Sequence, residues 1–218
     1  IPTNKLNVIP GGVDLSLFRP KDKSESKKQL ALTGGEIILA VARLEPLKGL
    51  DILLSAIYKI ENHSEITLLI AGDYLNNQIE FQRLQTIITA LQLTKNVKFL
   101  GNIEHTKMPL YMSAADVLVM PSYYESFGLA ALEAMACGTP VITSRNSGAK
   151  TFIEQGTSGY LIPWNCPEPY AERLETLLKN PILRANMGHQ AIIQANKMSW
   201  SIAATKTNGV YANLIKPA

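Results

Sequence analysis

Short apolar runs alternate with amphipathic segments along most of this chain. The runs cover residues 37–42, 66–71, 97–100, 117–120, 141–143 and 159–162. Because most of their residues are apolar without alternation, they predict strands buried on both faces, as in a parallel sheet covered by helices on each side. The pattern therefore predicts an α/β fold, a Rossmann-like doubly wound parallel sheet with helices on both faces.

Helical spacing fills several of the intervals. Apolar residues recur every three to four positions over 50–60 and 79–91, and residues 127–137 also have a helical pattern. From Pro167 onward the pattern is only helical, with breaks expected near residues 180 and 199. The polar stretch 21–28 is expected to be a solvated loop or a short surface helix.

The length fits one domain. A chain of 218 residues can bury a sizeable core. We expect a single domain over 1–218 that ends in a helix over 199–218. Because the sequence begins at Ile1 and not at methionine, we also expect it to be part of a longer protein.

Composition narrows the class of partner. A formal net charge of +3 suits an anionic ligand but is far too small to indicate nucleic-acid binding. Cys137 and Cys166 provide neither a disulfide framework nor a metal cluster, so a reducing compartment, the cytoplasm, is expected. The longest apolar runs fall well short of the roughly 20 residues that span a bilayer, so no transmembrane segment is predicted.

The strongest chemical signal follows the apolar run that ends at Met120. A polar loop containing Glu125 leads into a predicted helix that starts near Phe127. Free amides at a helix start, with Gly128 allowing close approach, form a site suited to phosphate. Glu133 falls among Ala, Leu and Met, so it needs a donor partner or a hydroxylated ligand. Taken alone, the two glutamates also fit a dipole-favoured residue and a partnered core residue.

A second cluster follows the first run, where ligands of parallel sheets usually bind. Arg43 and Lys48 leave the same strand end. Together they could clamp a diphosphate, Arg43 by two hydrogen bonds and Lys48 as a point charge. By themselves an arginine and a lysine in a loop are usually only solvated.

The sequence Glu-Ser-Phe-Gly-Leu-Ala-Ala-Leu-Glu over 125–133 resembles the signature of retaining glycosyltransferases of group 1, family 4, which have the GT-B architecture. The next residues, Ala-Met-Ala-Cys-Gly-Thr-Pro-Val-Ile over 134–142, are equally typical. The resemblance runs from about Val8 to the end of the chain. It covers only the C-terminal, donor-binding domain of that architecture.

The resemblance implies roles for these residues in moving a sugar from a nucleoside diphosphate donor with retention of configuration. Arg43 and Lys48 would neutralise the leaving diphosphate. Glu125 would hold hydroxyls of the transferred sugar and Glu133 those of the ribose. Backbone amides of Phe127, Gly128 and Leu129 at the helix start would bind phosphate.

Two further segments match the family less fully. At the end of the third run, Leu100 and Ile103 are the expected contacts to the nucleotide base, although plain core packing explains them equally well. Gly12 lies in a Pro-Gly-Gly-Val-Asp segment similar to the family's entry into this domain, but Gly11 stands where Asn is usual. Thr151 stands where many relatives have glutamate.

The resemblance also implies the partners. The donor would be a nucleoside diphosphate sugar, with UDP the expected nucleotide, and no cofactor or metal is expected. A sugar or lipid acceptor would bind through a missing N-terminal domain, so the isolated chain is expected to be inactive. The whole enzyme could associate peripherally with a membrane.

Other functions remain to be weighed. A dehydrogenase is disfavoured because no Gly-x-Gly-x-x-Gly turn joins a strand to a helix. A nucleotide-sugar epimerase of related architecture is a closer alternative, and a non-catalytic nucleotide-sugar-binding module is another. An adjoining Rossmann-like domain in the full-length gene would favour the enzyme.

Overall fold

A computed structural model describes residues 6–145, 148–163 and 166–215. Its strands are β1 Glu36–Val41, β2 Ile66–Ala71, β3 Val97–Gly101, β4 Val117–Met120, β5 Val141–Ser144 and β6 Gly159–Ile162. All pair in parallel, in the order β3-β2-β1-β4-β5-β6. The predicted doubly wound sheet is confirmed, and each predicted strand lies within one residue of an observed one.

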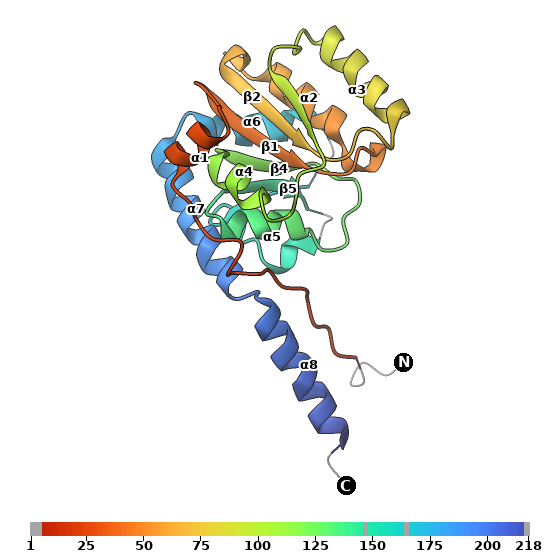
Figure 1. The fold of residues 1–218 in the computed structure, drawn as a ribbon, viewed down its shortest axis with the longest axis vertical. Coiled ribbons are helices and arrows are strands. Elements are labelled where there is room, and N and C mark those ends of the chain that lie inside the picture. The colour runs from red at the N-terminus through yellow and green to blue at the C-terminus, as the bar shows by residue number, and fades with distance from the viewer. Residues whose placement is uncertain (1–5, 146–147, 164–165, 216–218) are drawn as a thin grey trace.

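The helices lie on both faces of this sheet (Figure 1). They are α1 Lys23–Gln29, α2 Leu50–Lys59, α3 Gln78–Ala90, α4 Met108–Ala114, α5 Leu129–Ala136, α6 Pro167–Leu178, α7 Pro181–Asn196 and α8 Trp200–Ile215. Short 3-10 helices cover Pro46–Lys48, His63–Glu65 and Gly148–Thr151. Residues 216–218 of the predicted last helix lie outside the described residues.

The strands supply a hydrophobic core on each face. In β1, Ile38 and Ala40 join the core under α2, α3 and α6, whereas Ile37 and Leu39 join the core under α4, α5 and α7. Successive side chains of a strand point to opposite faces, so a continuous apolar run is what this sheet requires. Fully burying each of the Ile and Leu side chains contributes about 1.5–3 kcal/mol.

One helix differs from its prediction. The helix predicted to start near Phe127 begins at Leu129, because Gly128 has the left-handed φ of 91° and forms its N-cap. That conformation favours glycine and ends the preceding loop before the helix can begin. The free amides at the helix start therefore lie at Leu129 and Ala130 rather than at Phe127.

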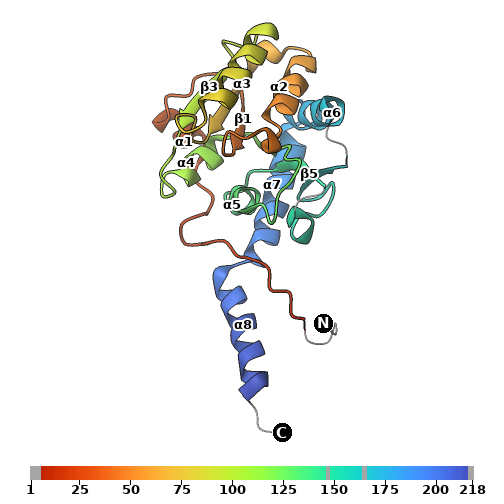
Figure 2. The ribbon, with the colours of Figure 1, turned by 90° about the vertical axis from the view of Figure 1, so that its right-hand side faces the viewer.

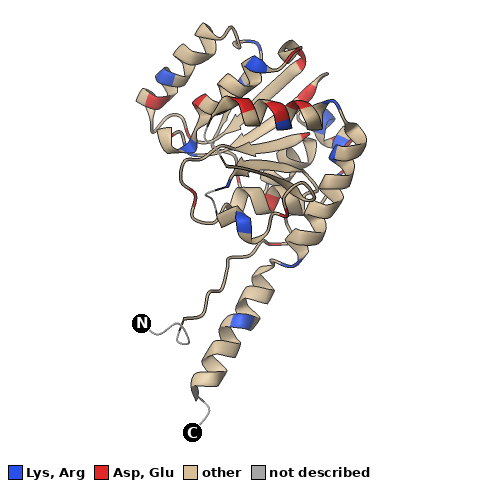
Figure 3. Cartoon of the chain, turned by 180° about the vertical axis from the view of Figure 1, so that it is seen from behind, with Lys and Arg blue, Asp and Glu red and all other residues tan. Residues whose placement is uncertain are grey.

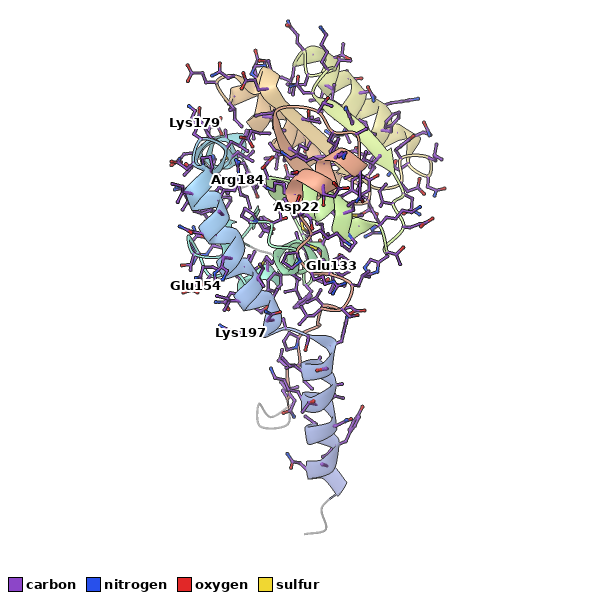
Figure 4. The ribbon with its side chains drawn as sticks, turned by 60° about the vertical axis from the view of Figure 1, so that its left-hand side comes forward. Asp22, Glu133, Glu154, Lys179, Arg184 and Lys197 are labelled. Atoms are coloured by element: carbon purple, nitrogen blue, oxygen red, sulfur yellow. The ribbon has the colours of Figure 1, made fainter. Side chains whose placement is uncertain are left out.

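The polar stretch 21–28 forms α1, but it is not simply a solvated surface. Lys23 and Lys27 reach the side chain of Asp116, which is only 2% exposed, at 3.0 and 3.1 Å. The N–H of Ile37 donates to the same carboxylate at 2.9 Å, and Arg184 of α7 lies 3.5 Å from it. This Asp116 cluster ties α1 and α7 to the amino end of the sheet. Figure 4 labels Arg184 on α7 and Asp22, the N-cap of α1.

The last helix leaves the body of the domain. In Figures 1 and 2, α8 projects away from the sheet, and the first described residues run out on the same side. The two segments meet where Val13 bridges to Ser199. Lys206 is the only charged residue in the sequence of α8, and Figure 3 shows charge spread instead over the body.

Candidate functional site

A pocket of about 440 Å³ opens at the carboxyl ends of β1, β2 and β4. The chain order reverses between β1 and β4, and ligands of doubly wound sheets bind at such a switch point. Five predicted site residues line it. The lining residues are Val41, Ala42, Arg43, Lys48, Ala71, Gly72, Asp73, Asn102, Ile103, Met108, Met120, Glu125, Leu129 and Ala130.

Lys48 and Glu125 meet at one edge of this pocket. The Nζ of Lys48 donates to Oε2 of Glu125 at 2.9 Å, and both side chains are about 15% exposed. Gly49 makes the approach possible with a φ of 65°, since a Cβ there would lie 2.3 Å from the carbonyl oxygen of Pro121. A glycine turn after β1 therefore sets the distance between the cation and the carboxylate.

Arg43 lies at the end of β1 and remains accessible. Its guanidinium pairs with Glu45 at 2.8 Å, but the side chain is 77% exposed. Exposed ion pairs contribute about 0–1 kcal/mol, so little energy holds Arg43 in this pose. The guanidinium can therefore exchange Glu45 for an anionic ligand in the pocket.

The loop before α5 is held against a second loop. The N–H of Gly148 donates to the carbonyl of Glu125 at 3.3 Å. A Cβ on Gly148 would lie 2.3 Å from the carbonyl oxygen of Ser126 and 2.4 Å from Cα of Phe127. Phe127 packs against Phe152 with ring centroids 5.3 Å apart. Phe127 and Gly128 therefore shape the loop, and neither lines the pocket.

Glu133 lies one helical turn beyond Leu129 on α5, just outside the pocket lining. Its Oε1 lies 2.9 Å from Nε2 of His105. Burial raises the pKa of the Glu133 carboxyl, and the hydrogen bond from His105 opposes that rise. The donor partner that the sequence required is therefore a histidine.

The two residues that were expected to contact the nucleotide base lie in different surroundings. Ile103 lines the pocket, whereas Leu100 packs on the core under α4 and α5. Gly12 lies away from the pocket and supports the start of α8, since a Cβ there would meet the backbone nitrogen of Trp200 at 2.4 Å. Leu100 and Gly12 therefore pack against other parts of the fold, and neither of them lines the pocket.

Two polar residues that were not predicted from the sequence also line the pocket. Asp73 follows β2, and its Oδ1 accepts from the N–H of Leu75 at 2.8 Å. Asn102 follows β3. The strand-end rule indicates both places, because Asp73 directly follows Gly72 after β2 and Asn102 directly follows β3, beside the predicted Ile103.

No metal site is evident in the described part of the chain. Among those residues, no group of three or more His, Cys, Asp or Glu side chains is placed to hold a metal ion. None of the described helices is long and apolar enough to cross a membrane.

The family of glycosyl transferases group 1 matches residues 22–194 of the sequence. That range contains the two glutamates, Glu125 and Glu133, and the two cations, Arg43 and Lys48. The chain belongs to this family. The resemblance to group 1 glycosyltransferases that residues 125–142 carry is thereby confirmed.

Curated group 1 relatives are about twice as long as this chain. D-inositol 3-phosphate glycosyltransferase 2 of Catenulispora acidiphila is 33% identical over 97% of the chain, which spans 51% of that protein. The D-inositol 3-phosphate glycosyltransferase of Frankia alni is 33% identical over 99% of the chain and 54% of the relative.

Solved structures carry the same fold. Sucrose-phosphate synthase of Thermosynechococcus elongatus matches with 31% identity and a TM-score of 0.88, over 95% of this chain and 52% of that one. Anabaena HepE, solved with UDP and glucose, has 26% identity and a TM-score of 0.85, over 94% and 56%. The C-terminal domain of Francisella tularensis LpcC shares the fold with a TM-score of 0.76 at 24% identity, over 85% and 97%.

Proposed function

We propose that this domain binds the nucleoside diphosphate sugar donor of a retaining hexosyltransferase, with UDP as the nucleotide. The observation that carries the proposal is the pocket at the switch point. There Arg43, Lys48 and the start of α5 converge beside Glu125. The crystal structures of HepE with UDP and with UDP-glucose support the choice of nucleotide.

The cations would act on the leaving group. Charge develops on the diphosphate as the sugar departs, and Arg43 and Lys48 would stabilise it together with the free amides of α5. No metal is needed for this step, because the two side chains and the helix start already supply positive potential. The established pair with Glu125 keeps Lys48 at the pocket edge before the donor arrives.

The glutamates would hold the sugars of the donor. Glu125 lies beside Lys48, so its carboxylate would accept hydrogen bonds from hydroxyls of the transferred sugar next to the diphosphate. Glu133, one turn further along α5, would accept from the ribose hydroxyls. Bonds to charged groups contribute about 1.5–3 kcal/mol each.

The acceptor would bind elsewhere in a longer protein. The chain spans about half the length of its curated relatives, so we infer that another domain supplies the sugar or lipid acceptor site. The isolated chain would then bind donor without transferring sugar. The cysteine content favours a cytoplasmic location, where the whole enzyme could associate with a membrane surface.

Calorimetric titration of the chain with UDP, GDP and ADP tests donor binding. We expect UDP to bind most tightly, and Arg43→Ala to weaken it about tenfold or more through loss of charged hydrogen bonds. Lys59→Ala is the matched control, since it removes one cation from an exposed pair with Glu168 outside the pocket. Equal weakening by both variants, or no UDP binding at all, would contradict the proposal.

The proposed retention of anomeric configuration must be tested with the full-length enzyme. Proton NMR of the first product should show the anomeric configuration of the donor sugar. An inverted product would overturn the retaining mechanism without affecting the assignment of the donor site.

A further inference from the structure

His105 links two elements that line the pocket. It lies in the loop between β3 and α4, which contributes Asn102 and Ile103 to the pocket lining. Its partner Glu133 belongs to α5, whose first residues Leu129 and Ala130 also line the pocket, and Figure 4 labels Glu133 there. The 2.9 Å contact between Nε2 and Oε1 therefore joins two elements that meet around the ligand space.

The surroundings of the two side chains differ. Glu133 is 15% exposed, whereas His105 is 64% exposed. The His105 ring packs on Phe18, with centroids 4.9 Å apart and a tilt of 60°. This contact orients an otherwise exposed imidazole toward the half-buried carboxylate.

The contact uses one carboxylate oxygen. Within the described residues, Oε1 of Glu133 bonds to His105, and no hydrogen bond involves Oε2. Nor is Oε2 among the described side-chain atoms that are both buried and unpartnered, so it remains open to solvent or a ligand. A carboxylate fixed through one oxygen loses less conformational entropy when the other accepts a hydrogen bond.

We propose that His105 is a positioning residue for the donor nucleotide. It holds Oε1 of Glu133 so that Oε2 accepts a hydrogen bond from a ribose hydroxyl. The proposal rests on the proposed function, because it takes the ligand to be a nucleoside diphosphate. His105 acts only through Glu133 and does not itself touch the substrate.

The test compares UDP with 2′,3′-dideoxy-UDP, which lacks both ribose hydroxyls. His105→Ala should weaken UDP about threefold to tenfold, in keeping with the loss of one hydrogen bond. It should leave the affinity for dideoxy-UDP unchanged. His105→Gln keeps an N–H donor and should restore most of the UDP affinity. Lys107→Ala, in the same loop, is the control and should behave like the wild type.

A second readout needs no nucleotide. Carbon NMR of the Glu133 side-chain carboxyl should report a higher pKa in His105→Ala than in the wild type, because the histidine hydrogen bond lowers it. An unchanged pKa would show that the pair does not form and would overturn the proposal whether or not nucleotide binds.

The outcomes separate this inference from the proposed function. Equal loss of affinity for both nucleotides would mean that His105 only maintains the pocket structure, and no loss for either would mean that it plays no part. Both results overturn the positioning role and leave the donor site intact. Absence of UDP binding by the wild-type chain would overturn the donor site itself and the nucleotide role of His105 with it.

Discussion

The two ends of the sheet use charge in opposite ways. At the amino end, Asp116 is buried and satisfied by Lys23, Lys27 and the N–H of Ile37. At the carboxyl end, Lys48 and Glu125 meet through one contact at the edge of an open pocket. The first arrangement joins helices to the sheet. The second leaves donors and acceptors available.

This difference separates stability from binding. A buried carboxylate with a full set of partners is costly to remove, because the buried Ile37 N–H then loses its acceptor and the two lysines lose their ion pairs. The Lys48–Glu125 pair instead faces an open pocket, where water or a ligand can replace either partner. We therefore expect substitutions at the amino end to change the free energy of unfolding and substitutions at the carboxyl end to change ligand affinity.

The largest expected effect is on stability. Asp116→Ala should lower the free energy of unfolding by about 2–4 kcal/mol, because it leaves the buried Ile37 N–H without its acceptor and removes the ion pairs of Lys23 and Lys27. Urea denaturation followed by circular dichroism measures this. Glu125→Ala is the comparison and should cost less, about 1 kcal/mol, because it removes one hydrogen bond beside a pocket that water can enter. A larger loss for Glu125→Ala would reverse the assignment of the two ends.

The next effect is on binding. Lys48→Ala should weaken UDP about tenfold to a hundredfold, since it removes a cation from the pocket edge. Its free energy of unfolding should change by no more than about 1 kcal/mol. Calorimetry and urea denaturation of the same preparation measure both quantities. Retention of wild-type affinity would remove Lys48 from the donor site.

The Asp116 cluster should also be sensitive to acid. Burial alone would raise the pKa of Asp116, but Lys23, the Ile37 N–H and Lys27 together hold it below its ordinary value of 3.8. A carboxyl with a lowered folded pKa contributes stability above its unfolded pKa and loses it as the pH falls through the folded pKa.

The stability gap between the wild type and Asp116→Asn should therefore be constant near neutral pH and should shrink below about pH 3.8. Urea denaturation at a series of pH values measures the gap. A gap that stays constant into the acid range would mean that the charge of Asp116 does not stabilise the fold.

The smallest expected effect concerns the exposed ion pair of Arg43 and Glu45. Glu45→Gln should change the free energy of unfolding by less than about 0.5 kcal/mol, because Arg43 is already largely exposed. UDP affinity should stay equal or rise slightly as Arg43 is released. Calorimetry checks this, and a marked loss of affinity would show that Glu45 holds Arg43 in its binding position.

Local patterns predicted the fold well because the sheet is uniform. All strands are parallel, and the four inner strands of the sheet are covered by helices on both faces. A continuous apolar run is therefore sufficient to locate a strand. The prediction was less accurate at Phe127, where helical composition continued backward through Gly128. Only the left-handed conformation of that glycine shows where the helix begins.

Contacts between distant residues could not be read from one sequence. Arg43, Lys48 and Glu125 were found because each follows a predicted strand end, and strand ends gather at one edge. His105 and Glu133 are 28 positions apart, and no local sequence pattern around either residue indicates that the two are in contact. Asp116 gave one usable signal, a single acid directly before a fully apolar strand, which implies buried partners.

The central place of β1 has a consequence for synthesis of the chain. One edge of β1 pairs with β2, but its other edge waits for β4, with Ile38 opposite Val117. During translation, which adds about 5–20 residues per second, the backbone N–H and C=O groups of that edge stay unpaired for several seconds after β1 leaves the ribosome. An unpaired strand edge can pair with other chains. The nascent domain is therefore most prone to aggregation, and most in need of chaperones, during this interval.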